Sequence, residues 1–232
     1  MVDFNRIIEH FKTTPIPDNM LQRGQLVLNE FLKPIRILFE QKAVPQQGWT
    51  DKQIAFLLET LSQMDTDKDQ NASRVGEREA RIASDLQLKV SGGFCHGVGR
   101  SGFLTAPQPK APGGSIMYEI TNYLARHTLK TFGLPNIKKA IVVPICTGMS
   151  LSLCLSALKP DWISEEGSKK RTVLLPQVDH NSLLKALDFL GLNVKVVKGK
   201  VFNDAFRFFL YDIINALDDS CFAVVSVTSF FP

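Results

Sequence analysis

The sequence has few cysteines and histidines, and neither type is spaced for cross-linking or for metal binding. Only four cysteines occur in 232 residues, and no two of them form a C-x-x-C pair. So sparse a set excludes the dense disulfide framework of small secreted domains. The four histidines form no H-x-x-x-H or similar cluster, so we expect no metal site. These residues are Cys95, Cys146, Cys154, Cys221, His10, His96, His127 and His180.

Long apolar runs are also missing. No stretch of about 18 consecutive apolar residues occurs, so we expect no membrane-spanning helix. Asp3, Arg6, Glu9 and Lys12 interrupt the first turns of the chain, which is unlike a secretory signal. The default expectation is therefore a cytosolic protein without a membrane partner.

A strong excess of charge of one sign is absent as well. The net charge is +4 and charged residues make up 22% of the chain. A dedicated nucleic-acid module normally carries a denser basic patch. The small positive excess therefore permits an anionic partner without requiring one.

What the sequence does contain is, first, a helical front. Apolar residues recur at three- and four-residue spacings over 20–42, which predicts a helix that Pro34 should kink or split. Thr50 is placed to cap a second helix over 51–64. The segment 65–73 is polar, and we expect it to form a mobile loop.

From residue 139 onward, short apolar runs alternate with helical patterns. We expect strands at 140–145, 172–175, 194–197 and 222–228, with helices at 149–158, 182–190 and 206–217. Such alternation is typical of a parallel sheet in an α/β fold, whose ligands lie at the carboxyl ends of the strands. No helix follows the fourth strand to cover the sheet, so we expect the chain to be the front part of a larger domain.

The segment 97–102 matches the G-x-G-x-x-G pattern of dinucleotide-binding turns. That interpretation requires a helix that starts inside the pattern. Pro107, Pro109 and Pro112 exclude a regular helix there, so dinucleotide binding is a remote alternative. Glycines, cations and amide donors still make the segment a candidate phosphate loop, against the plainer interpretation of a glycine-rich surface turn. Its donors are Arg100, Ser101, Gln108 and Lys110.

Three further segments carry candidate binding residues. Arg78 lies between Glu77 and Glu79, where local ion pairs are the plainer alternative to an anion contact. Residues 146–150 join an expected strand to an expected helix, and backbone amides at a helix N-terminus attract phosphate. Residues 179–182 stand at the next such junction, where His180 could stack on a flat ring or belong to a helix cap. For each segment both alternatives remain open.

Taken together, several runs closely resemble the O-phosphoseryl-tRNA(Sec) selenium transferase family, with the same order and spacing. The resemblance extends from about residue 20 to the end of the chain. It implies the large domain of a pyridoxal-phosphate-dependent transferase of fold type I, the aspartate-aminotransferase-like fold. The matching runs are 75–84, 96–102, 108–111, 120–122, 142–144 and 147–151.

The resemblance also implies an activity and a division of the chain. Family members convert O-phosphoseryl-tRNA(Sec) to selenocysteinyl-tRNA(Sec) with selenophosphate as selenium donor, and they assemble as homotetramers. By resemblance, residues 1–47 form an N-terminal helical extension used in tetramer assembly, and 48–138 hold helices and the phosphate loop at 99–109. Residues 139–232 would be the front part of the cofactor domain.

Individual roles carry over by position. Arg78 resembles the arginine that contacts the cofactor phosphate, and Glu77 resembles a filter against free amino acids with an α-carboxylate. The family's cofactor-phosphate turn falls on Cys146, Thr147 and Gly148. His180 joins the candidate cofactor-binding residues because it could stack on the cofactor's ring. The positions that hold the substrate's phosphate match Arg100, Ser101 and Gln108.

Two departures bear on activity. Where the family commonly has Asp-Gln-Lys-Ser, this chain has Asp179-His180-Asn181-Ser182, so a cationic contact is lost at Asn181. The lysine that binds the cofactor covalently lies in the family beyond the point that matches Pro232, so we expect no catalytic residue in this chain. The first hypothesis is therefore a partial selenium transferase. The alternative is a short, non-catalytic form that binds partner subunits or tRNA.

Overall fold

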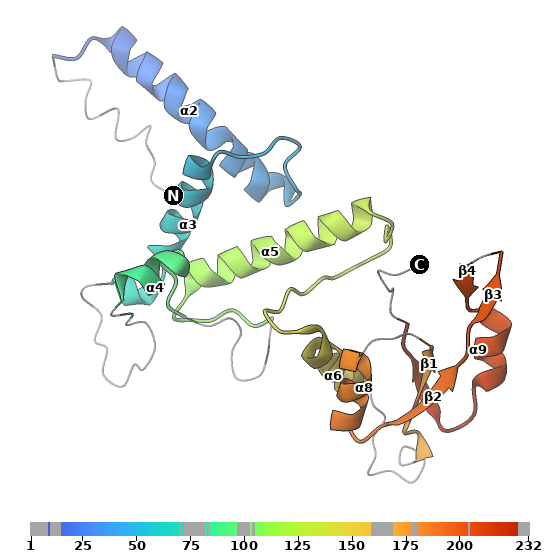
Figure 1. Ribbon diagram of the computed structural model, residues 1–232. Helices are drawn as coiled ribbons and strands as arrows, with labels where there is room; N and C mark the ends of the chain where they lie inside the picture. Colours follow the sequence, from blue (N-terminus) through green and yellow to red (C-terminus); the bar gives the residue numbers. More distant parts are fainter. Residues whose placement is uncertain are drawn as a thin grey trace. The chain divides into compact units, whose positions relative to one another are not determined.

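The computed structural model of the protein describes residues 9, 15–69, 71, 82, 84–96, 103, 105–158, 169–177, 181–203 and 205–226 (Figure 1). Contacts divide the chain into two compact units, Met1–Val142 and Val143–Pro232. The boundaries expected from the family, near residues 47 and 138, concern roles and stay a prediction. No helix among the described residues is both long and apolar enough to cross a membrane.

The first unit is helical in its described parts. Helix α2 (Asp18–Gln41) runs without interruption through Pro34, which the sequence analysis expected to kink or split it. The splitting expected at Pro34 is wrong, since Ile35 and Leu38 directly after the proline are buried and their packing holds the helix together. Short helix α4 (Asp85–Val90) was not predicted.

Helix α3 (Asp51–Ser62) begins where the sequence predicts. Thr50 Oγ1 accepts a hydrogen bond from Gln53 N at 3.3 Å, and Gln53 Oε1 accepts one from Thr50 N at 3.0 Å. This reciprocal pair is a capping box, which satisfies two amides that the helix leaves unpaired. Gln53 also donates from Nε2 to Phe31 O at 3.2 Å, so the cap ties α3 to α2.

Removal of this cap gives the first testable expectation. Thr50→Ala should lower the free energy of unfolding of the first unit by about 1 kcal/mol, because Gln53 N loses its acceptor. Thr50→Ser keeps an acceptor oxygen and should stay close to wild type. Urea unfolding followed by circular dichroism measures both variants. Equal midpoints for the alanine and serine variants would show that the box contributes nothing.

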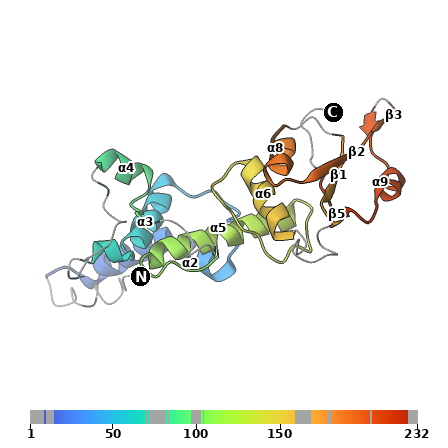
Figure 2. The same ribbon diagram turned by 90° about the horizontal axis from the view of Figure 1, so that it is seen from below.

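Helix α5 (Pro112–Thr131) is the longest described helix after α2, and the sequence analysis missed it. The three prolines do exclude a helix before it, but Pro112 occupies its first turn, where a missing amide costs nothing. Helix α5 packs against α3 (Figures 1 and 2). Directly after α3 in the chain comes a turn of 3₁₀ helix, η1 (Thr66–Lys68). The mobile loop expected at 65–73 is therefore wrong for residues 65–68, because Asp65 and Asp67 are buried.

The second unit contains the predicted parallel sheet. Its strands lie in the order β2 (Asn193–Val197), β1 (Thr172–Pro176), β5 (Cys221–Val224), and both pairings are parallel. The chain moves from β1 to β2 through α8 (Asn181–Phe189) and back past β1 to β5 through α9 (Leu210–Ala216). Right-handed crossovers in opposite directions place these two helices on opposite faces of the sheet.

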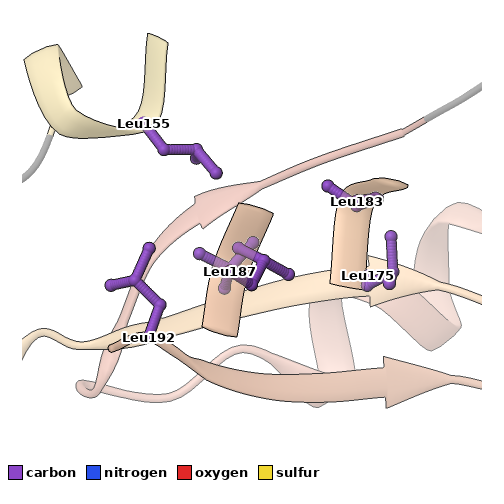
Figure 3. Packing of buried hydrophobic residues seen from close by; sticks show 6 residues of the cluster. Leu155, Leu175, Leu183, Leu187 and Leu192 are labelled. Carbon is purple, nitrogen blue, oxygen red and sulfur yellow. The ribbon is translucent and has the colours of Figure 1, made fainter. Parts of the chain in front are cut away.

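The core of this unit lies between β1 and two helices, α6 (Thr147–Leu158) and α8. Val173 and Leu175 are two residues apart and face the same side of the sheet, where they meet Leu183 and Leu187 of α8 and Leu155 of α6 (Figure 3). Leu187 and Val173 are fully buried. This packing holds α6 and α8 side by side on one face of the sheet.

Two predictions for residues after 139 are wrong. Residues 140–145 form no strand: within the first unit, Val142 N donates to Asn122 Oδ1 at 2.9 Å and not to a neighbouring strand. The helix expected at 206–217 begins only at Leu210, because β4 (Ala205–Arg207) pairs antiparallel with β3 (Lys200–Phe202). Asn203, with φ 47°, adopts the left-handed conformation that this hairpin turn requires.

Candidate functional site

The structure describes four of the nine candidate binding residues. Five others, and the whole G-x-G-x-x-G pattern at 97–102, lie outside the described residues. The described four are Gln108, Cys146, Thr147 and Gly148, and the other five are Glu77, Arg78, Arg100, Ser101 and His180. Gln108 belongs to the first unit and the other three to the second, so each group is considered by itself.

In the second unit, Cys146 takes the N-cap position of α6. Its carbonyl accepts hydrogen bonds from Ser150 N at 2.9 Å and from Ser150 Oγ at 3.1 Å. Cys146 and Thr147 are exposed and Gly148 is half-buried. The first amides of α6 are therefore open to a ligand from the side of Cys146 and Thr147.

A second helix start lies against Gly148. A Cβ built on Gly148 would stand 3.4 Å from the carbonyl oxygen of Ser182 and 3.7 Å from its Cβ. Ser182 is in the first turn of α8, so the N-termini of α6 and α8 meet at this glycine. Neither first turn contains an acidic residue. Two positive helix ends whose described first turns carry no carboxylate form a site suited to a dianionic phosphate.

This meeting point also lies where a parallel sheet binds ligands. Helix α8 starts only a few residues after the carboxyl end of β1, at Pro176. Gln177 N donates to Val197 O at 2.8 Å, so β1 and β2 end together at this edge. The structure thus joins two motifs that the sequence analysis could only list separately, the turn at 146–148 and the helix start at 181–182.

In the first unit, hydrogen bonds of the main chain hold Gln108. Its N–H donates to Ser115 Oγ at 2.9 Å, and its carbonyl accepts from Ala111 N at 2.9 Å. Ser115 belongs to the first turn of α5, so Gln108 is fixed relative to that helix. Its main-chain groups are used in this turn, and its side-chain amide carries the donors that a substrate's phosphate would need.

Lys68 forms a second polar cluster in the first unit. Its ammonium contacts the Asp67 carboxylate, donates to Gly93 O at 3.2 Å and lies 3.7 Å from Cys95 Sγ. Burial disfavours the charged ammonium, but Asp67 and Cys95 outweigh it and raise the pKa of Lys68. Burial and the Asp67 carboxylate also raise the pKa of the Cys95 thiol. Lys68 therefore remains a neutralised cation, and Cys95 remains a protonated thiol at neutral pH.

Metal-binding clusters are not found in the described part of the chain. No three or more of its histidines, cysteines, aspartates and glutamates come together in an arrangement that could hold an ion. The four cysteines are all free thiols. The chemistry that the described residues support is thus the binding of anions at helix ends and amide groups.

Comparison with known proteins gives a consistent result. The family model described as "O-phosphoseryl-tRNA(Sec) selenium transferase, SepSecS" matches residues 64–232. The transferase of Methanococcus maripaludis is 44% identical over 237 aligned positions, which cover 100% of this chain and 51% of that protein. The transferase of Methanopyrus kandleri is 46% identical, over 94% of this chain and 48% of its own length.

A solved structure agrees with these relatives. It is described as the crystal structure of archaeal O-phosphoseryl-tRNA(Sec) selenium transferase, and it superimposes with a TM-score of 0.77 at 46% identity. The alignment covers 88% of this chain and 45% of that one. The chain therefore spans about half the length of the proteins that it matches.

Proposed function

This chain belongs to the O-phosphoseryl-tRNA(Sec) selenium transferase family, and from that premise we propose that it supplies the phosphate-binding part of such an enzyme. The proposed reaction converts O-phosphoseryl-tRNA(Sec) to selenocysteinyl-tRNA(Sec), with selenophosphate as the selenium donor. The proposed cofactor is pyridoxal phosphate. The proposed assembly is a cytoplasmic homotetramer that binds tRNA(Sec).

The observation that carries this proposal is the meeting of two helix N-termini at Gly148. Pyridoxal phosphate carries a phosphate dianion, and α6 and α8 offer backbone amides at ends whose described first turns hold no carboxylate. A glycine at the contact lets the two helix starts lie close together, since a Cβ there would already be in van der Waals contact with Ser182. The described residues therefore fit the cofactor's phosphate.

Two further roles concern the cofactor. Arg78 would add a cation at its phosphate by its family position. His180, which stands where the family commonly has glutamine, would lie against the ring because it follows a strand of the sheet. Glu77 would disfavour free amino acids by repelling their α-carboxylate. When bound, the cofactor supplies an electron sink, while the protein supplies orientation and charge.

The substrate's phosphate would be held by residues of the first unit. Arg100 would give two parallel hydrogen bonds, and Ser101 and the Gln108 amide would donate one each. The phosphate is also the proposed leaving group, so donors that face it stabilise the charge that grows on it. Gln108 is suited to this role because its main chain is already fixed.

The phosphate site can be tested without any activity. Pyridoxine 5′-phosphate has no aldehyde and cannot react with surface lysines, so its binding reports contacts to the phosphate and ring. We expect the chain to bind it at least tenfold more tightly than pyridoxine, because two helix ends act on the phosphate alone. Gly148→Asp should abolish this difference, because it adds a carboxylate at the helix ends.

Gly48→Asp is the matched control. Gly48 has open space around it and lies in the first unit, so the same carboxylate there should leave both affinities unchanged. Isothermal titration calorimetry measures the affinity of the wild type and both variants for each of the two ligands. Equal affinity of the wild-type chain for pyridoxine and its phosphate would reject the proposed site.

A further inference from the structure

The turn at the end of α3 holds the chain on both sides of the candidate phosphate loop. We call residues 61–68 the anchor turn. On the upstream side, Lys68 Nζ donates to Gly93 O at 3.2 Å. Gly93 also packs directly on the anchor turn, since a Cβ built on it would lie 2.8 Å from Ser62 Oγ. The chain is thus fixed four residues before Gly97.

On the downstream side the contacts are more numerous. Thr66 donates from both N and Oγ1 to Lys110 O, each at 2.9 Å. Gly114 N donates to Asp65 Oδ1 at 3.0 Å. Gly113 leaves no space at all, because a Cβ built on it would stand 1.7 Å from Leu61 O. The chain is therefore fixed again directly after Gln108.

The two fixed points also touch each other. A Cβ built on Gly114 would stand 3.7 Å from Phe94 Cδ1 and 3.6 Å from Asp65 Oδ2, both ordinary contact distances. Residues 94 and 114 thus lie side by side although 20 residues separate them. The ends of the candidate phosphate loop are thus held together, and closing a chain segment at its ends lowers its conformational entropy.

We propose that Asp65, Thr66 and Lys68 are positioning residues for the substrate's phosphate, because they close the base of the loop that carries the phosphate-binding side chains. This inference rests on the function proposed for that loop. None of the three is assigned to the phosphate itself. They act through Gln108, whose N–H is held by Ser115 on the same helix start.

The charges of the anchor turn explain why it positions the loop and does not bind the phosphate. Helix α5 has no acidic residue in its first turn and no side-chain cap on Ala111, so its amides would attract an anion. The buried Asp65 carboxylate already accepts from one of them, Gly114 N, and places its negative charge at this helix end. Asp67 likewise neutralises Lys68. Both positive features are thus closed to the substrate, which leaves its phosphate to the loop.

The test measures two affinities in the same chain. Asp65→Ala and Lys68→Met release opposite ends of the loop, so each should raise the Kd for O-phosphoserine about tenfold. Neither should change the Kd for pyridoxine 5′-phosphate, whose site lies in the second unit. Asp65→Asn keeps an acceptor oxygen for Gly114 N and should recover most of the lost affinity.

Asp51→Ala and Lys33→Met are the controls, since both remove exposed charges from helices of the same unit. Amide exchange measured by mass spectrometry should rise at 93–96 and 110–115 in the two anchor variants and stay unchanged in α2. If the wild-type chain binds O-phosphoserine and the Kd is the same in Asp65→Ala and Lys68→Met, this inference is overturned. The proposed function then stays intact. Failure of the wild-type chain to bind O-phosphoserine would overturn the role of the loop, and this inference with it.

Discussion

Replacing Gly113 by alanine is expected to destabilise the first unit by about 3 kcal/mol, the upper end of the usual cost of overpacking. The new Cβ would stand 1.7 Å from the carbonyl oxygen of Leu61 and 2.6 Å from its carbon. These are backbone atoms at the end of α3, so no side chain can rotate away to relieve the contact. Helices α3 and α5 would have to separate, and the base of the phosphate loop would open with them.

The adjacent glycine gives a control with the opposite expected sign. A Cβ on Gly114 meets its nearest atom, the Ala111 Cβ, at 3.4 Å, and the others at ordinary contact distances. Gly114→Ala should therefore be neutral or stabilise α5 by about 0.5 kcal/mol, through the lower chain entropy of the unfolded state. Urea unfolding with amide exchange in α3 and α5 measures both variants. Similar stabilities for the two would show that α3 and α5 do not approach as described.

Local signals were sufficient to predict those elements that depend on neighbouring residues. Thr50 and Gln53 are three residues apart, and their capping box follows from chemistry within one turn. The parallel pairing of β1 with β2 and with β5 is confirmed as well. It followed from short apolar strands alternating with helices, which admit few arrangements. Both successes use information that a window of a few tens of residues contains.

The wrong predictions concern segments whose partners decide their structure. The run at 140–145 is apolar and β-branched, which indicates a strand only where a neighbouring strand is available. Its amide at Val142 instead binds the side chain of Asn122. The segment 206–217 has helical spacing, but its first residues gain more from pairing with β3 in a hairpin. Composition alone does not distinguish these outcomes.

The anchor turn was missed for a related reason. Asp65, Thr66 and Asp67 stand in a polar stretch, which favours a solvated loop when it is considered by itself. Their partners lie far along the chain, with Gly114 49 residues from Asp65 and Lys110 44 residues from Thr66. The role proposed for Gly148 in phosphate binding followed from its place between an expected strand and an expected helix. Its contact with Ser182 required the fold of the second unit.

The largest effect in the second unit is expected from Leu187→Ala. Leu187 is 0% exposed and packs with Leu155, Val173 and Leu183 between α6, α8 and β1 (Figure 3). Truncation leaves a cavity that a strand and two helices cannot easily close, so the loss of stability should be 2–5 kcal/mol, roughly the range for buried leucines. Leu184, one helical turn away in the same helix, is 44% exposed, and Leu184→Ala should cost less than about 1 kcal/mol.

The consequence of Leu187→Ala for binding distinguishes a damaged core from a lost ligand contact. Leu187 lies six residues after the start of α8. The packing of Leu187 keeps α6 and α8 together, so that their N-termini meet at Gly148. We expect Leu187→Ala to weaken pyridoxine 5′-phosphate binding in proportion to the unfolded fraction, and to regain wild-type affinity where a stabilising osmolyte restores folding. Gly148→Asp should remain defective under the same conditions. If osmolyte leaves the Leu187→Ala defect unchanged, the core does not position the two helix ends.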